Sequence, residues 1–192
     1  DAGMKRATLA DLKGGDPSIF GRATEEIDAC RAAGVPVAIC PGVTAASAAA
    51  ASLGTSLTLR GLARKLVFAT AHARAGEALD LDWQALADPN ATLAIYMGKA
   101  AASDISRQLI ASGLPSETPV ALVENASLPG EQCFRTRLDL LPLAARTALG
   151  DGPMLLLIGA ALNGALATEP KSQAKDAKPI AKSAQWISDK GF

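Results

Sequence analysis

Residues 35–54 read VPVAICPGVTAASAAAASLG and contain a strand, a tight loop and a helix in direct succession. The apolar run at 35–40 is rich in β-branched residues, which predicts a buried strand. Pro41-Gly42 closes that run and predicts a tight loop. Alanine dominates residues 43–53, which predicts a helix, and Gly54 is a typical C-terminal cap. A strand that leads directly into a helix indicates an α/β fold.

The sequence outside this unit continues the alternation of strands and helices. Upstream, Ile27, Cys30 and Ala33 recur three positions apart, which predicts a helix over 24–33. Downstream, residues 54–64 lack periodicity and are interpreted as a linker. Further strands are predicted at 65–70, 91–97, 119–124 and 153–158, with helices between them at about 82–87, 100–112 and 138–148.

The order of these elements predicts a largely parallel sheet that helices cover on both faces. Residues 131–137 alternate in polarity and follow Pro129-Gly130, which predicts a hairpin with the preceding strand. Such a hairpin would make the sheet mixed. Beyond Asn163 the composition shifts to Lys, Ala, Ser, Gln and Pro, so residues 164–192 are expected to form a poorly ordered tail.

Composition argues against several classes of function. The chain has 19 basic and 19 acidic side chains, without the basic excess typical of nucleic-acid-binding proteins. Its longest apolar stretches, 43–53 and 154–162, are shorter than the roughly 20 residues that span a membrane. No leader peptide opens the chain, so a cytoplasmic protein is expected. Three scattered cysteines and the single histidine, His72, predict neither a disulfide framework nor a metal site.

Paired glycines precede an Asp-Pro step at residues 14–17. Gly14 and Gly15 allow backbone conformations and a close ligand approach that a side chain would block. The Asp16 carboxylate can accept hydrogen bonds from ribose hydroxyls or from nearby backbone N–H groups. A glycine-rich turn with a helix-initiating Asp-Pro is an equally good explanation. The motif matches neither the G-x-G-x-x-G dinucleotide fingerprint nor a P-loop.

Further candidate positions lie where predicted strands end. Thr44 and Ala45 stand between a strand and a helix, the usual ligand crevice of an open α/β sheet. Thr44 can cap the helix or contact a ligand, while Ala45 leaves room for a flat ring. Met97 and Ala126 also follow strand ends, although core packing is an alternative explanation for Met97. One crevice at this sheet edge would collect all of these positions.

Charge is unevenly distributed along the neutral chain. From Ala29 to Gly76 there is no Asp or Glu, while five basic residues give the stretch a charge of +5. Such a stretch suits a small polyanionic ligand or a carboxylate-rich substrate. An ordinary solvated face is the alternative explanation.

Several of these motifs, taken in order, resemble the tetrapyrrole (corrin/porphyrin) methylase family. The strongest match runs from Lys13 to Arg22 (KGGDPSIFGR) and continues in Glu25-Glu26. Its Phe-Gly-Arg extension points to the uroporphyrinogen-III C-methyltransferase branch. Further matches follow at 41–46, 57–58, 60–62, 96–98, 119–121, Glu124 and 155–159, so the resemblance extends from about residue 9 to 162.

The resemblance implies a methyltransferase that binds S-adenosylmethionine between two α/β domains with mostly parallel or mixed sheets. Members of this branch methylate the tetrapyrrole uroporphyrinogen III at carbons 2 and 7, which gives precorrin-2 for cobalamin and siroheme synthesis. On this basis residues 1–56 belong to an incomplete first domain, 57–64 to a linker and 65–163 to a second domain. A homodimer is expected by the same analogy.

The family's functional residues carry over to positions of this sequence. Cofactor contacts are implied for Gly14, Gly15, Asp16, Ile19, Thr44, Ala45, Met97 and Ala126. Arg22 and Arg60 are the candidate partners of the substrate carboxylates. Because a reduced tetrapyrrole is an electron-rich carbon nucleophile, catalysis would depend mainly on aligning it with the sulfonium methyl group.

The sequence also departs from the family pattern. Family members begin with a strand and a Gly-Pro-Gly-Asp-Pro loop that contribute cofactor contacts and the acid and base residues, whereas only twelve residues precede Lys13. No catalytic acid or base is therefore assigned. Asp11, Leu59 and Ala71 replace a usual arginine, histidine and glycine. The alternatives are another tetrapyrrole methylase, a diphthine synthase-like methyltransferase, or a truncated, non-catalytic remnant that binds the cofactor.

Overall fold

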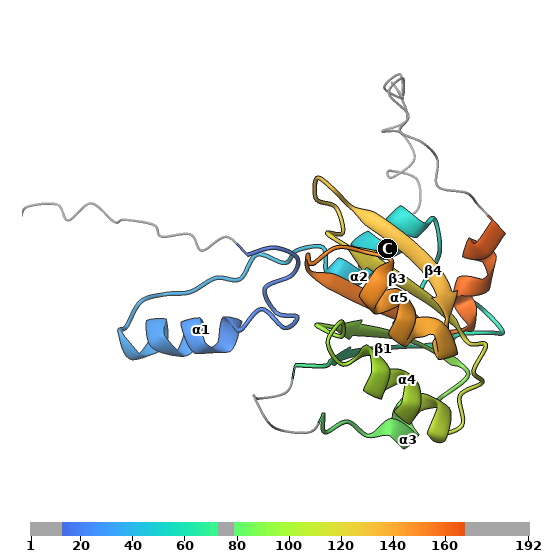
Figure 1. Ribbon diagram of the computed structural model, residues 1–192. Coiled ribbons are helices and arrows are strands. Elements are labelled where there is room, and N and C mark those ends of the chain that lie inside the picture. Colours follow the sequence, from blue (N-terminus) through green and yellow to red (C-terminus); the bar gives the residue numbers. More distant parts are fainter. Residues whose placement is uncertain (1–12, 73–78, 168–192) are drawn as a thin grey trace, which may run out of the picture.

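A five-stranded sheet forms the centre of the protein. The computed structural model describes residues 13–72 and 79–167 of the chain. Across the sheet the strand order is β1-β2-β5-β3-β4 (Figure 1). The strands are β1 (Lys65–Thr70), β2 (Ala91–Tyr96), β3 (Pro119–Glu124), β4 (Gln132–Arg137) and β5 (Met154–Ile158), close to the predicted positions.

The sheet is mixed, as the predicted hairpin requires. β3 and β4 form that hairpin, and Glu124 lies opposite Gln132 at the end where the connecting loop joins the two strands. β1 and β2 pair in parallel, so both end at the same sheet edge. A largely parallel sheet is not observed, because β5 inserts between β2 and β3 and runs antiparallel to both.

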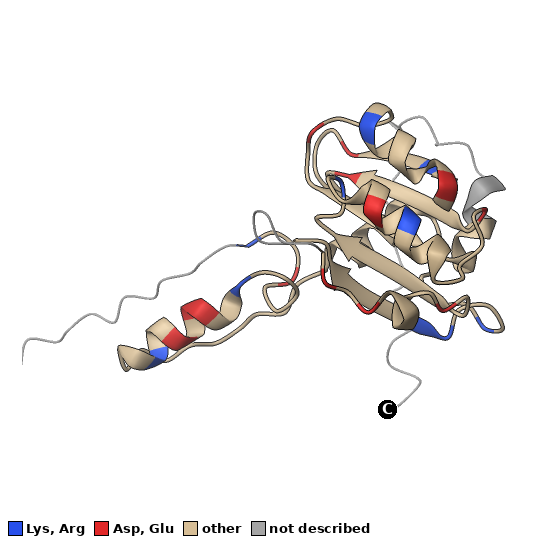
Figure 2. Ribbon diagram, turned by 60° about the horizontal axis from the view of Figure 1, so that its bottom comes forward, with Lys and Arg blue, Asp and Glu red and all other residues tan. Residues whose placement is uncertain are grey.

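Helices cover both faces of the sheet, as predicted. On one face lie α3 (Trp83–Leu86), α4 (Ala102–Ala111) and α5 (Leu141–Thr147), and on the other lies α2 (Ala45–Leu53). In β5, Leu156 and Ile158 pack on the first side, while Leu155 and Leu157 pack on the second. A strand buried on both faces is apolar throughout, which explains why β5 shows no polar alternation. Figure 2 shows the charged residues mainly on helices and loops rather than on the central strands.

Small side chains allow α2 to lie close to the sheet. Ala46 and Ala49 of this helix are completely buried. The helix ends as predicted at Gly54, whose φ of 63° is the left-handed conformation that favours glycine. The predicted helix at 138–148 is a short 3-10 turn, η1 (Leu138–Leu140), followed by α5.

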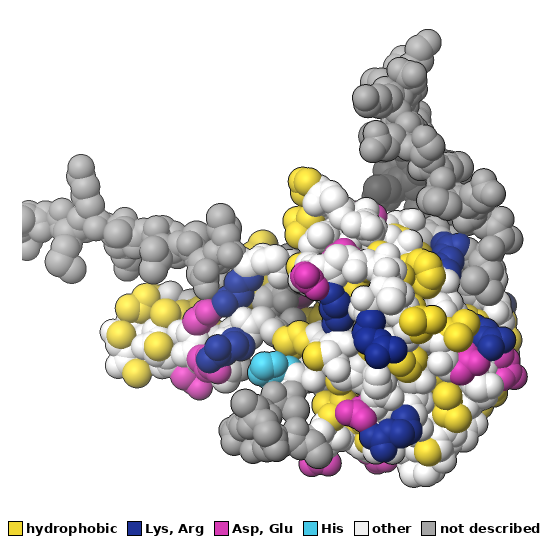
Figure 3. Space-filling model, viewed as in Figure 1, with side chains coloured by type: hydrophobic (Ala, Val, Ile, Leu, Met, Phe, Trp, Pro, Cys, Tyr) yellow, Lys and Arg dark blue, Asp and Glu magenta, His cyan; other side chains and the backbone are white. Residues whose placement is uncertain are grey.

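The predicted buried strand at 35–40 is wrong. The helix predicted before it is present as α1 (Ala23–Ala32), but α1 buries no residue, and every residue from 31 to 43 is exposed. Val35, Val37 and Ile39 are 51%, 44% and 47% exposed. Figures 1 and 3 show α1 and the segment after it, residues 23–43 (the α1 arm), extending away from the sheet with hydrophobic side chains on its surface. A strand is stable only within a ladder, and the described residues place no partner strand beside this segment.

The remaining segments are short or irregular. Residues 54–64 form the predicted irregular connection, apart from an isolated bridge between Leu59 and Ala63. The predicted tail begins within a 3-10 helix, η2 (Ala160–Ala167), and continues from residue 168 outside the described residues. No helix in the described part is long and apolar enough to cross a membrane. Residues 13–72 and 79–167 also contain no group of three potential metal ligands.

We expect amide hydrogen exchange to separate the α1 arm from the sheet. Amides at 23–43 should exchange fastest, because α1 buries no side chain and the segment after it has no strand partner. Amides of β2, β5 and β3 should exchange slowest, since each is paired with strands on both sides. Mass-spectrometric exchange measures both regions at once, and equal protection of the arm and these three strands would contradict this expectation.

Candidate functional site

A hollow of about 210 Å³ lies where β2 ends, between the loop at 14–21 and the start of α2. Its lining contains seven of the eight positions that the sequence predicts as cofactor contacts, all except Ala126. Phe20, Gly21 and Tyr96 complete the lining. A second hollow of about 240 Å³ lies at the opposite sheet edge, beside Asp88 and Thr118, but it contains none of the predicted positions. The convergence of predicted residues makes the first hollow the candidate site.

The carboxylate of Asp16 joins the two loops of this hollow. Its Oδ1 accepts a hydrogen bond from Ser18 N at 2.8 Å, and its Oδ2 accepts one from Gly42 N at 3.1 Å. These backbone bonds, first that of Ser18 and then that of Gly42, lower the pKa of Asp16 from its ordinary value of 3.8. The Asp16 carboxylate therefore accepts hydrogen bonds from backbone N–H groups, which is one of its two predicted roles.

Glycine is required at the contact between these loops. A Cβ atom added at Gly42 would lie 2.1 Å from the carbonyl oxygen of Gly15. Gly15 itself has φ of +80°, the left-handed conformation that side chains disfavour. The two backbones can therefore touch only while position 42 lacks a side chain, and the backbone conformation at position 15 favours glycine there as well.

Tyr96 connects the hollow to the sheet. Its hydroxyl is hydrogen-bonded to Thr44 Oγ1 and accepts a bond from Ala46 N at 3.2 Å. Its ring packs against Phe20, with ring centroids 4.8 Å apart, and against Phe68 at 5.9 Å. Thr44 occupies the N-cap position of α2, as one alternative predicted, but its side chain makes no capping bond, and the tyrosine hydroxyl accepts the bond from Ala46 N instead. Tyr96 belongs to the matched stretch 96–98 but was not among the predicted contacts, although its place as the only tyrosine, at a strand end, was a usable signal.

Left-handed backbone conformations mark the ends of two strands at this edge. Met97, directly after β2, has φ of 56° and is 48% exposed, so core packing does not explain it. Asn125 and Ser127, which flank Ala126, have φ of 53° and 64°. Such conformations cost free energy and concentrate at functional sites. Ala126 packs partly buried on the α2 side of the sheet and does not line the hollow.

The two predicted substrate arginines lie outside the hollow. Arg22 is exposed and pairs with Glu25, Nη2 to Oε2 at 2.6 Å, and this partner raises the pKa of Arg22. Arg60 is exposed in the linker. Acidic residues from outside the basic stretch at 29–76 neutralise part of its charge, because Arg31 pairs with Asp28 and Lys65 pairs with Asp88.

Asp16→Asn should remove an acid-sensitive contact. Because the pKa of Asp16 is lowered in the folded protein, its bonds stabilise the loop at neutral pH and are lost as the pH falls below the ordinary value of 3.8. Protection of the Ser18 and Gly42 amides, measured by NMR exchange, should fall on acidification in the parent chain but stay low at every pH in the variant.

A matched control is Asp88→Asn, because the Asp88 carboxylate accepts a similar bond from Asn90 N at 2.8 Å. This control should leave Gly42 protection unchanged. An acid-dependent loss of Gly42 protection that persists in Asp16→Asn would show that another group controls the loop contact.

The sequence of this chain is similar to those of known proteins. The profile of the tetrapyrrole (corrin/porphyrin) methylases matches residues 4–142. The uroporphyrinogen-III C-methyltransferase of Paracoccus denitrificans is 48% identical over 160 residues, which cover 83% of this chain and 55% of that protein. The siroheme synthase of Gluconacetobacter diazotrophicus is 44% identical over 159 residues, 83% of this chain and 34% of that protein. The chain therefore spans about half the length of the first relative and about a third of the second.

Solved structures share the fold. A cobalt precorrin-4 methyltransferase gives a TM-score of 0.71 at 30% identity, over 78% of this chain and 62% of that one. The uroporphyrin-III C-methyl transferase of Thermus thermophilus, complexed with S-adenyl homocysteine, gives 0.66 at 34% identity, over 79% and 65% of the two chains. The shared sequence pattern and the shared fold together establish that this chain belongs to the tetrapyrrole (corrin/porphyrin) methylase family.

Proposed function

We propose that this chain provides much of the S-adenosylmethionine site of a uroporphyrinogen-III C-methyltransferase. The reaction would methylate uroporphyrinogen III at carbons 2 and 7 and give precorrin-2. The observation that carries the proposal is the convergence of seven predicted contacts around one hollow. The Paracoccus relative carries the name of this activity, and the Thermus structure holds S-adenyl homocysteine. Because the chain spans 55% of the Paracoccus relative, the complete reaction is proposed for a protein of that full length.

The lining of the hollow suits part of this cofactor. Gly14 and Gly15 expose backbone groups, Ala45 leaves space, and the rings of Phe20 and Tyr96 offer apolar surface for a flat ring. At about 210 Å³, however, the hollow is below the usual range for small-molecule pockets, roughly 300–1,000 Å³. The described residues would therefore hold one part of the cofactor, and the remaining length of a full-size relative would enclose the rest.

Positioning is the main task of these residues. S-adenosylmethionine supplies an electrophilic methyl group on a sulfonium centre. Holding this methyl group in line with a nucleophilic carbon lowers the barrier through alignment alone. Arg22 and Arg60 remain the proposed partners of the substrate carboxylates. For Arg22 this role requires its release from Glu25.

A later corrin intermediate is the second candidate substrate. The TM-score with cobalt precorrin-4 methyltransferase, 0.71, exceeds the 0.66 with the Thermus enzyme. Sequence identity favours uroporphyrinogen III, since it is 34% to the Thermus enzyme and 30% to the cobalt precorrin-4 enzyme. Sequence identity reflects the residues of a site more directly than backbone similarity does, so uroporphyrinogen III is the preferred substrate. A homodimer is proposed from the resemblance alone.

Calorimetric titration with S-adenosylhomocysteine tests the proposal. We expect weak binding by this chain and tighter binding by a fusion that adds the N-terminal portion of the Paracoccus relative. Mass spectrometry of the fusion's product from uroporphyrinogen III should show two added methyl groups. Failure of both proteins to bind would refute the proposal, whereas binding without any methylated product would favour a non-catalytic remnant.

Tyr96→Phe should weaken binding of S-adenosylhomocysteine by about thirtyfold, since each lost hydrogen bond costs about 1 kcal/mol and the tyrosine hydroxyl makes two. The ring and its contact with Phe20 are retained. Ser106→Ala is the matched control, because it removes a buried hydroxyl that donates to Leu138 O away from the hollow. Titration of both variants should show reduced affinity only for Tyr96→Phe. Equal affinities of the two variants would show that the Tyr96 hydroxyl does not contribute to binding.

A further inference from the structure

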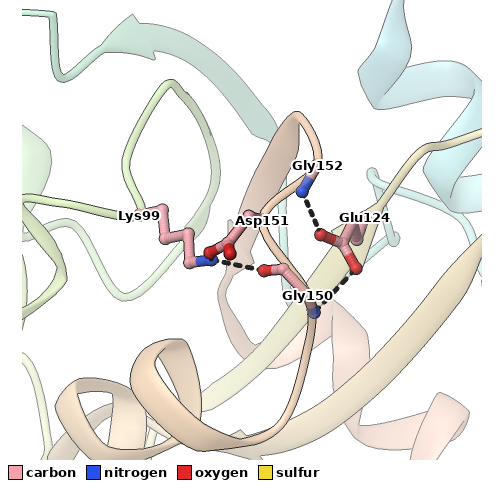
Figure 4. Close-up of polar contacts among 5 residues, drawn as sticks. All are labelled: Lys99, Glu124, Gly150, Asp151 and Gly152. Carbon is pink, nitrogen blue, oxygen red and sulfur yellow. Dashed lines mark hydrogen bonds and ion pairs between the residues drawn. The ribbon is translucent and has the colours of Figure 1, made fainter.

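A buried carboxylate ends β3. Glu124 is 1% exposed, and its two oxygens accept hydrogen bonds from backbone N–H groups of the loop before β5 (Figure 4). Gly150 N donates to Oε2 at 2.9 Å, and Gly152 N donates to Oε1. Burying a carboxylate is costly unless donors of this kind are held in place. The carboxylate and the loop at 150–152 therefore stabilise each other.

The sequence of the loop fits this contact closely. A Cβ atom added at Gly150 would lie 3.1 Å from Glu124 Oε2. One added at Gly152 would lie 2.6 Å from Asn125 Oδ1. A side chain at either position would crowd the side chains at the end of β3, so glycine fits both places.

Lys99 holds the same loop from the end of β2. Its Nζ donates to the carbonyl oxygen of Gly150 and pairs with Asp151 Oδ1 at 2.7 Å (Figure 4). Lys99 follows Met97 by two residues, and Met97 lines the hollow. The loop is thus bound on one side by the residue that ends β3 and on the other by the segment that follows β2.

The chain leads directly from Glu124 at the end of β3 to Ala126, another predicted cofactor contact. Asn125 N donates to Pro153 O at 3.0 Å, and Ala126 comes next. β2 and β3 are not neighbours, because β5 lies between them. The loop that leads into β5 is therefore the bridge between the strand ends that carry Met97 and Ala126.

From this geometry we propose that Glu124 is a positioning residue, which sets the position of Ala126 relative to Met97 through the loop at 150–152 and Lys99. The proposal rests on the proposed function, in which Met97 contacts S-adenosylmethionine, and on the contact that the family resemblance implies for Ala126 outside the hollow. Glu124 itself does not line the hollow. Its contribution would be to hold two strand ends at the separation that the cofactor needs.

Glu124→Gln tests the first step without any ligand. The amide keeps the shape of the side chain but places an NH₂ group against one of the two backbone donors. Exchange of the Gly150 and Gly152 amides should become at least about tenfold faster, as expected for loss of one charge-assisted bond. The NMR signals of the Met97 methyl group and the Ala126 amide should shift together. Unchanged exchange, or a shift at only one of the two signals, would overturn the proposal.

Two control variants separate positioning from general loss of stability. Thr92→Val is a buried substitution of the same shape on β2, at a hydroxyl that has no partner among the described residues. It should move neither signal. Leu109→Ala empties a fully buried position on α4 and should lower the melting temperature while leaving the Met97 and Ala126 signals in place.

Titration with S-adenosylhomocysteine then tests the link to binding. Glu124→Gln and Lys99→Met should each weaken affinity by about five- to tenfold. The double variant should lose little more than either single one, because both break the same bridge. Additive losses would overturn the bridge, and normal affinity in Glu124→Gln would overturn the positioning role. If the parent chain does not bind at all, the proposed function fails, while the ligand-free signals still decide whether Glu124 couples the two strand ends.

Discussion

The hydroxyl of Tyr96 connects the sheet to the segments that precede it in the sequence. Tyr96 ends β2, a strand with neighbours on both sides, so its position is fixed by the best-buried part of the protein. Its hydroxyl holds the start of α2 through Thr44 and Ala46, and its ring holds the loop at 14–21 through Phe20. The candidate hollow lies where these three segments meet. Its shape therefore depends on one side chain more than on any helix or strand.

The second constraint is the close contact of two backbones. Gly42 lies so close to the carbonyl oxygen of Gly15 that no side chain fits at position 42, and the Asp16 carboxylate closes the contact by accepting a hydrogen bond from Gly42 N. A hydrogen bond to a charged acceptor is stronger than one between neutral groups, which explains why a carboxylate suits this place. At the neighbouring strand ends a second carboxylate, Glu124, binds loop N–H groups in the same way. Both acids bind backbone N–H groups.

The α1 arm, residues 23–43, gains little stability from the sheet. α1 has acidic residues in its first turn and a basic residue in its last, which favour the helix through its dipole. It nevertheless buries no side chain, and the apolar run after it is exposed. Burial normally supplies most of the stability of a helix, and strand partners supply that of a strand. The arm carries the sequence pattern of a packed strand and helix, while the chain spans only about half of the Paracoccus relative.

Local sequence determined much of this protein. Continuous apolar runs gave the positions of β2, β3 and β5, because strands buried on both faces need no polar alternation. An apolar run also predicted β1, which lies at the sheet edge and is more exposed. Gly54 ended α2, and the glycine and Asp-Pro motif placed the loop of the hollow. Motif order also assigned the family, since those residues lie at the strand ends where ligands bind. Tertiary structure alone decided the rest. The antiparallel insertion of β5, the absent strand at 35–40, and the roles of Tyr96 and Glu124 all depend on partners far away in the sequence. A window of local sequence contains no information about such partners, because pairing and burial are set by the assembled sheet.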